Sequence, residues 1–252
     1  MGESPLTLPL SPKGASARQG RVIGAWNARA YLGGMDPSIA ALFPDRFVDL
    51  ELGEIPEGWG VGALDDMLEL LSGGTSKTSV AEYWDGNIPW YTAKDAPTPS
   101  DVFVVETERK ITQAGIENSA AKMLPAGTTI ITARGTVGRL ACLGIPMTMN
   151  QTCYGIRGVQ GYPDFFTYMN IKMTVNELQQ RTHGTIFDTI TRQTFKLIDA
   201  IIPPPKLADK FETVVQPIMS HILSNLNESR ALTALRDTLL PKLISGELRV
   251  GV

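Results

Sequence analysis

Polar side chains gather at the ends of predicted strands and in the turns that follow them. Arginine and lysine suit the edges of guanine, asparagine and glutamine suit adenine, and threonine or lysine can bind a phosphate. One such side chain, taken alone, also fits a solvent-exposed turn, whereas a group of them on a small scaffold favours recognition of DNA. The candidates for DNA contact are Lys77, Thr92, Lys94, Arg134, Thr136, Arg139, Asn150, Gln151, Arg181 and Arg192, with Thr191 and Gln193 beside the last of them.

Motifs for catalysis or cofactor binding are much weaker. Residues 72–79 (SGGTSKTS) resemble a phosphate-binding loop, but they lack the spacing of that motif and are better interpreted as a backbone turn. His183 and His221 lie far apart in the sequence and have no neighbours typical of a metal site. Acidic pairs such as Asp65 and Asp66 are typical of a solvated surface. We therefore expect no catalytic residue, no metal and no cofactor.

The composition is that of an ordinary globular protein. The chain has 252 residues, of which 43% are hydrophobic, and a formal net charge of −3, which allows one or two domains. A small negative charge argues against a protein that coats nucleic acid, but it is compatible with a local basic surface. Cys142 and Cys153 lie in apolar runs and are expected to be buried thiols in a reducing compartment. Since no targeting sequence and no membrane-spanning run is recognisable, a cytoplasmic protein is expected.

Four segments are expected along the chain, within an α+β fold. Residues 1–34 are rich in Pro, Gly, Ser and Ala and predict a poorly ordered leader or a short helix. Residues 35–55 are expected to be a linker that begins with a helix-start signal, Asp36 followed by Pro37. Residues 56–205 predict one globular domain of short strands and helices, and residues 206–252 predict a long helical arm.

Within the globular domain, β-rich runs alternate with turns. Thr128–Thr132 and Val137–Leu143 predict two strands joined as a hairpin. Met147–Ile156 is expected to be a further strand, and Asp164–Gln180 a helix with an apolar face. A buried strand in Leu197–Ile202 is expected to close the domain before three consecutive prolines end it.

An apolar stripe runs along the predicted arm at spacings of three and four residues, the period of one helix face. About forty residues of helix would span about 60 Å at 1.5 Å per residue. Pro217 interrupts the pattern and is expected either to kink the helix or to mark a late start. A lone amphipathic helix of this length leaves its stripe uncovered, so pairing with another helix is expected. The expected pairing residues are Phe211, Val215, Ile218, Ile222, Leu226, Leu232, Leu235, Leu239 and Leu243.

Short motifs follow one another in a definite order along the chain. They are IPEGW at 55–59, SGGT at 72–75, YWDGNIPW at 83–90, LPAGT at 124–128, ARGTVG at 133–138, MNQ at 149–151 and LLPKLISGEL at 239–248. In this order they resemble the motifs of the specificity subunits of type I restriction-modification systems. The resemblance extends from about Met35 to Val250 and covers one target recognition domain.

This resemblance implies a subunit that binds double-stranded DNA without methylating or cutting it. Such subunits are scaffolds for type I methyltransferase subunits, and a translocating restriction nuclease subunit joins them. A full-length member has two recognition domains, each reading one part of a split site, whereas this chain resembles one half alone. It is therefore expected to form a homodimer or to pair with another half specificity subunit, and two-fold pairing predicts a palindromic split target.

Two alternatives stay open at this point. One is an inactive or truncated remnant of a specificity subunit that keeps only the fold. The other is a methyltransferase or nuclease fragment with catalysis of its own, which the missing cofactor loop and carboxylate cluster oppose. The target bases are not readable from the residues, because DNA shape also contributes to recognition.

Overall fold

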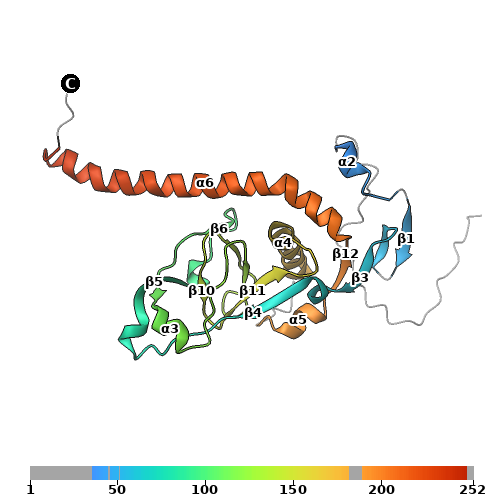
Figure 1. Cartoon of the computed structure of the whole chain (residues 1–252), viewed down its shortest axis with the longest axis horizontal. Helices are drawn as coiled ribbons and strands as arrows, with labels where there is room; N and C mark the ends of the chain where they lie inside the picture. Colours follow the sequence, from blue (N-terminus) through green and yellow to red (C-terminus); the bar gives the residue numbers. More distant parts are fainter. Residues whose placement is uncertain (1–35, 45, 51, 182–188, 249–252) are drawn as a thin grey trace, which may run out of the picture.

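The computed structural model describes residues 36–44, 46–50, 52–181 and 189–248, although for Ser38 and residues 176–181 it describes the backbone alone. The expected leader, residues 1–34, lies outside this part of the chain, as does His183. The α+β class is confirmed, since a sheet-rich domain is followed by one long C-terminal helix (Figure 1). None of the helices in the described part has the length and apolarity needed to cross a membrane.

Regular structure begins ahead of the main domain. The short helix α2 (Pro37–Ala40) starts at the expected proline, and β1 (Phe47–Leu50) then pairs antiparallel with β2 (Gly53–Pro56). Gly53 has a φ of 102°, a left-handed conformation that glycine adopts without strain. The segment expected to be a linker therefore contains a hairpin, which the local pattern of four-residue strands is too short to indicate.

A five-stranded sheet forms the centre of the domain. Its order is β4 (Leu68–Ser72), β11 (Cys153–Gly158), β8 (Thr129–Thr132), β9 (Leu140–Leu143) and β6 (Phe103–Val104). Neighbouring strands from β4 to β9 are antiparallel, and β6 lies parallel to β9. The expected hairpin in residues 128–143 is confirmed as β8 and β9.

Smaller sheets flank the central one. In one of them, β5 (Trp84–Tyr91) pairs in parallel with β10 (Thr148–Met149) and antiparallel with β7 (Lys110–Ile111). The other joins β12 (Asp199–Ile202) to β3 (Gly60–Ala63) and confirms the expected closing strand. Short helical turns connect these strands, namely η1 (Leu64–Met67), η2 (Ala81–Tyr83), η3 (Ala93–Asp95), α3 (Gln113–Glu117) and α5 (Arg192–Lys196).

One expected strand, Met147–Ile156, is wrong as a single element. It is divided into β10 and β11 by a turn at residues 150–152. The Asn150 side-chain oxygen accepts hydrogen bonds from the Thr152 amide at 3.1 Å and the Thr152 hydroxyl at 2.8 Å. An asparagine that bonds its own backbone two residues later forms a local turn that competes with strand pairing.

The helix α4 (Asp164–Arg181) confirms the expected helix and packs on the central sheet. Its buried residues Ile171 and Val175 share one apolar cluster with Ile131 of β8 and Ile156 of β11. These four side chains are less than a tenth exposed, so this cluster fixes the helix against the sheet.

The C-terminal helix α6 (Pro205–Ile244) is 40 residues long and starts directly after β12. Pro204 is its N-cap and Pro205 its first residue, where a missing N–H is tolerated. Pro217 lies inside the helix, so the expectation that it marks a late start is wrong. Figure 1 shows α6 bending in its N-terminal part, the part that contains Pro217, as expected for an interior proline.

The two halves of α6 have different surroundings. In the first half, Met219 is buried and Val215, Leu223 and Leu226 pack on a cluster formed by Phe103, Cys142 and Tyr168. Val215 and Leu226 were expected to pair with another helix, but they contact their own domain, because its surface supplies the apolar partner that the stripe requires. The Phe211 ring, also expected in the pairing set, lies edge-on to the Phe166 ring at 5.8 Å. By contrast, every residue from 231 to 248 is exposed.

Candidate nucleic-acid interface

Several strand termini of the central sheet lie at one edge. Since β11 runs antiparallel to β4 and β8, and β8 antiparallel to β9, the ends of β4 and β8 meet the starts of β9 and β11. The segments at this edge are residues 73–78, 133–139 and 150–152. They carry a large part of the predicted DNA-contact set: Lys77, Arg134, Thr136, Arg139, Asn150 and Gln151.

The small sheet adds residues 92–95 to the same edge. Tyr91 is the partner of Met149 in the parallel pair, and the next amide, that of Asn150, donates to the Tyr91 carbonyl at 2.9 Å. The predicted contact residue Thr92 is used within the chain, since its amide and hydroxyl both donate to Asp95 at 2.8 Å. Residues 73–78, 92–95, 133–139 and 150–152 are called the polar edge below.

The loop 73–78 is held closely by backbone contacts. A Cβ at Gly73 would lie 2.1 Å from the Asn150 carbonyl oxygen, and one at Gly74 would lie 2.2 Å from the Ala121 nitrogen, so a larger residue would displace the backbone. Indole N–H groups hold the loop carbonyls: Trp90 donates to Gly74 at 2.9 Å and Trp84 donates to Lys77 at 3.1 Å. The loop is thus held in one conformation and presents Thr75 and Lys77 to solvent, and the turn expected in residues 72–79 is found at residues 78–79.

Two arginines of the predicted contact set donate hydrogen bonds to their own chain. The Arg139 guanidinium donates to the carbonyls of Ala96 at 2.6 Å and Pro97 at 2.8 Å. Arg192 donates to the Leu70 carbonyl at 2.6 Å and the Ser72 hydroxyl at 3.1 Å. Arg139 thereby joins the polar edge to the backbone just after residues 92–95, and Arg192 bonds to the end of β4 just before residues 73–78. One guanidinium can make several such bonds because it carries five N–H donors in a fixed plane.

Three other predicted cations stay available to a ligand. Lys77, Lys94 and Arg134 are exposed, and no hydrogen bond or ion pair to their charged groups occurs within the described residues. Asp95 is the one acidic residue in the sequence of the polar edge, and its carboxylate accepts from Thr92 and from the Glu108 amide at 2.7 Å. The edge is therefore locally basic although the whole chain is acidic, which favours an anionic ligand.

The remaining predicted residues divide between contact and support. Gln151 is hydrogen-bonded to the Thr75 hydroxyl across the edge, and Asn150 holds its turn as described. Thr136 is exposed, and its carbonyl accepts from the Thr132 hydroxyl. Arg181 is the last residue of α4, and its side chain lies outside the described part of the structure.

Arg109 is a further candidate that the sequence did not indicate. Its guanidinium carbon lies 3.7 Å from the centre of the Trp84 ring and 5.4 Å from that of Trp90. The same two indoles hold the loop that presents Lys77. Stacking on an aromatic ring restricts an otherwise mobile side chain and leaves its N–H edge free. No sequence spacing links residue 109 to residue 84, and only the pairing of β5 with β7 brings them together.

Nucleophilic chemistry is disfavoured at both cysteines. Cys142 and Cys153 are free and buried, as expected. Burial raises the pKa of the Cys142 thiol to about 12 and that of Cys153 to about 11, so neither forms a thiolate readily near neutral pH. Within the described residues, no group of three or more His, Cys, Asp or Glu side chains is arranged to hold a metal ion.

Known proteins similar to this chain were found by sequence and by structure. Residues 56–239 match the family model of the type I restriction modification DNA specificity domain. The MjaIX specificity subunit, a type I restriction enzyme subunit of Methanocaldococcus jannaschii, is 30% identical over 172 residues, which are 68% of this chain and 40% of that protein. The HindI specificity subunit of Haemophilus influenzae is 28% identical over 217 residues, 83% of this chain and 47% of that protein.

A solved structure is similar in fold. It is the S subunit of a type I restriction-modification system from M. genitalium, with a TM-score of 0.53 and 16% identity, and the match covers 74% of this chain and 46% of that one. The matched part of this chain thus spans less than half the length of these relatives. Because the family model covers most of the sequence, the chain belongs to the type I restriction modification DNA specificity domain family, as its ordered motifs suggested.

Proposed function

We propose that the polar edge reads one part of a split DNA target and that the chain acts as a specificity subunit of a type I restriction-modification complex. The observation that carries this proposal is the grouping of Lys77, Lys94 and Arg134 at one sheet edge, beside the amides of Asn150 and Gln151; the three cations are exposed, and their charged groups have no partner among the described residues. Cations attract the phosphate backbone, and forked or planar polar groups fit base edges in the major groove.

Different residues of the edge take different parts in this proposal. Arg134 is the strongest candidate for base recognition, because its side chain is exposed and its guanidinium can bind guanine in a bidentate way. Lys77, Lys94 and the stacked Arg109 are assigned to phosphates. Arg139 and Arg192 are assigned to supporting the backbone next to the polar edge, because each donates hydrogen bonds to carbonyls of its own chain.

The second half of α6, together with Ile218 and Ile222 on the solvent-facing side of its first half, is assigned to pairing with another helix. Ile218, Ile222, Leu232, Leu235, Leu239 and Leu243 keep between 39% and 59% of their surface exposed, and such a stripe on one helix face is stabilised by burial against a second helix. The partner is a second copy of the chain or another half specificity subunit. Antiparallel pairing would place two recognition domains at a separation set by the helix, whose 40 residues span about 60 Å.

The remaining partners follow from the family. The MjaIX and HindI relatives are specificity subunits of type I restriction enzymes. On this basis the chain is proposed to recruit type I methyltransferase subunits and a restriction translocase subunit to double-stranded DNA in the cytoplasm. The domain responsible for reading is proposed to comprise residues 56–205, which are most of the residues that match the family model, 56–239.

Selection of DNA from a random pool by the purified full chain tests the reading role. Arg134→Ala should weaken binding by about 1–3 kcal/mol and relax one position of the selected motif. Lys94→Ala should weaken binding evenly across sequences and lower the salt dependence by about one phosphate contact. Lys210→Ala, which removes an exposed lysine of α6 away from the polar edge, is the matched control and should change neither.

The role in the complex is tested in cells. Long-read sequencing of methylated DNA from cells with and without this gene should show that one split methylated motif disappears with the gene. An unchanged pattern of methylation would contradict the proposal and indicate a remnant that keeps only the fold. Binding of S-adenosylmethionine by the isolated chain would instead indicate catalysis of its own.

A further inference from the structure

Residues 208–230 of α6 are attached to the domain through apolar side chains and, within the described part of the chain, through two polar contacts. The apolar contacts run from Ala208 to Leu226. Apolar contact is non-directional, so by itself it defines poorly how a helix is rotated or how far it is shifted along its axis. The two polar contacts, made by Glu212 and Arg230, are directional.

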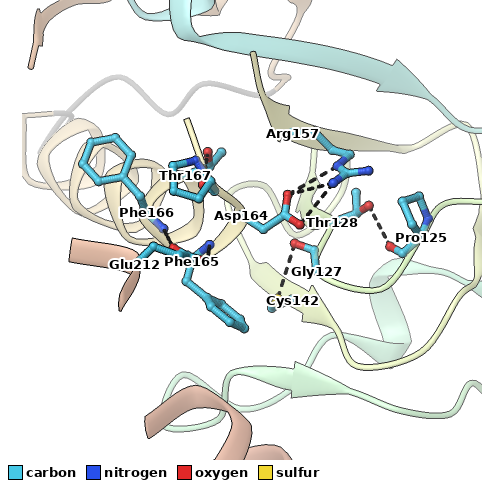
Figure 2. A network of polar contacts seen from close by, with 11 residues as sticks. Pro125, Gly127, Thr128, Cys142, Arg157, Asp164, Phe165, Phe166, Thr167 and Glu212 are labelled. Atoms are coloured by element: carbon cyan, nitrogen blue, oxygen red, sulfur yellow. Dashed lines mark hydrogen bonds and ion pairs between the residues drawn. The ribbon is translucent and has the colours of Figure 1, made fainter. Parts of the chain in front are cut away.

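Glu212 binds the start of another helix. Figure 2 shows its carboxylate facing the first turn of α4, where it accepts hydrogen bonds from the backbone amides of Phe165 at 3.3 Å and Phe166 at 3.0 Å. The first amides of a helix lack partners within the helix, and its dipole favours a negative charge there. A carboxylate of α6 therefore serves as the cap of α4, and it joins two helices that are distant in sequence.

The neighbouring carboxylate at the start of α4, that of Asp164, already has a partner. Asp164, the first residue of α4, is paired with Arg157 at 3.1 Å, and the same carboxylate lies where a Cβ at Gly127 would approach to 2.6 Å. The Cys142 thiol donates to the Gly127 carbonyl at 3.6 Å (Figure 2). The start of α4 that Glu212 contacts is therefore held in place on the sheet, by its own ion pair and by close packing against Gly127.

The second polar contact lies eighteen residues further along, about 27 Å at 1.5 Å per residue. There Arg230 forms an ion pair with Glu106, and the two side chains are 38% and 69% exposed. An exposed pair of this kind contributes little to stability. It lies far from Glu212, however, and so restricts rotation of the helix about the first contact.

The negative charge of Glu212 does not stabilise the folded chain at neutral pH. Burial raises its pKa above the usual value, and the nearby carboxylates of Asp164 and Asp209 raise it further, while the two amide hydrogen bonds lower it. A carboxyl whose pKa is raised by folding contributes stability at low pH that is lost as the pH rises through the folded pKa. At neutral pH the ionised group therefore costs folding free energy, whereas its two hydrogen bonds define a direction.

Small changes of direction have large effects at the far end of α6. Ile244 lies 32 residues beyond Glu212, or about 48 Å of helix. A tilt of about 5° at the attachment would displace that end by about 4 Å, which exceeds the rise of about 3.4 Å per base pair. The angle of attachment, and not only the length of α6, therefore determines how far apart two paired recognition domains lie.

We infer that Glu212 is a positioning residue: with Arg230 as the second contact, it fixes α6 at one angle to the polar edge and so restricts the DNA target to one number of base pairs between its two parts. This inference rests on the proposed function. Glu212 touches no DNA in this scheme, and the sequence of each half-site is left to the polar edge.

The angle is measured directly on the full chain. Spin labels at Lys122→Cys on the domain and Thr233→Cys on α6, both exposed positions, report one distance distribution when labelled chains are diluted with unlabelled ones. We expect Glu212→Ala to broaden this distribution at least about twofold. Glu212→Gln, which keeps one acceptor oxygen, should have an intermediate effect and should melt within a few degrees of the native chain. Glu228→Gln removes an exposed carboxylate of the same helix and is the matched control.

The consequence for DNA is read from methylation in cells that carry each variant. Glu212→Ala should keep both half-site sequences and should add motifs whose spacers differ by one base pair, whereas Glu228→Gln should keep a single spacer. An unchanged distance distribution, or one unchanged spacer in spite of a broadened distribution, would overturn the inference. If the native chain directs no split methylated motif, the proposed function fails, and the distance measurement still decides whether Glu212 fixes the angle.

Discussion

The two halves of α6 share one sequence pattern and differ in what covers it. In the first half, Met219 is 2% exposed and lies against Phe103, Cys142 and Tyr168 of the same chain. In the second half, Leu235 and Leu239 are 56% and 43% exposed. A stripe with three- and four-residue spacing therefore predicts that a helix face will be covered, but not whether its own domain or another molecule will cover it.

Aspartate substitutions in the second half of α6 should distinguish most clearly between packing on the chain's own domain and pairing with another molecule. Leu235→Asp combined with Leu239→Asp should abolish self-association at micromolar concentration, since burial of each leucine contributes about 1.5–3 kcal/mol and two chains lose four of them. Sedimentation velocity measures this effect, and thermal unfolding of the domain should stay unchanged. A chain that associates as before would show that this half is not the pairing surface.

Reactivity of the Cys142 thiol, which lies beneath the first half of α6, tests whether that half is covered by its own domain. Burial, followed by the charges of Asp164 and Glu212, raises the pKa of Cys142 to about 12. At pH 8 its thiolate fraction is then about one in ten thousand, so a disulfide reagent should react more than about a thousand times more slowly than with an ordinary thiol of pKa about 8.5. The rate should rise with pH over the range in which the chain stays folded, and in denaturant both cysteines should react at once. Rapid reaction of Cys142 in the native chain would mean that α6 does not cover it.

Truncation of a buried side chain compares the covered and the exposed face of the first half of α6. Met219→Ala should lower the free energy of unfolding by about 2–5 kcal/mol, because it leaves a cavity beneath α6. Ile218→Ala changes the neighbouring residue, which is 57% exposed, and should stay within about 0.5 kcal/mol. Both are compared by urea unfolding in the association-deficient background. Equal effects at the two positions would remove the distinction between a covered and an uncovered face.

Long elements with a regular pattern are predictable from this sequence, and short ones closed by side chains are not. The hairpin β8–β9, the helix α4 and the long α6 follow from periodicity and from the prolines before α6. Periodicity fails at Asn150, because its side-chain bond to Thr152 interrupts a β-rich run. It fails again at Val215 and Leu226, where the partner is a tertiary surface that no local pattern describes.

The sequence predicted which residue types lie at the polar edge, but not which of them are exposed to a ligand and which bind their own chain. Lys77, Lys94 and Arg134 are exposed as a contact residue must be. Arg139 and Arg192 have the same chemistry but bind carbonyls of their own chain, and only the pairing of distant segments shows this. Arg109 has no sequence signal, because its position over Trp84 depends on β5 meeting β7.

The strand β9 connects these parts of the molecule over a very short distance. Arg139, just before β9, belongs to the polar edge, while Cys142 within it lies beneath α6, and a Cβ at Gly144 just after it would lie 2.8 Å from Leu223 of that helix. Four residues of strand measure roughly 13 Å, and a packed protein interior is barely compressible. A force that bent DNA exerted on the loop before β9 would therefore be transmitted through one stiff strand to the middle of α6, near Leu223.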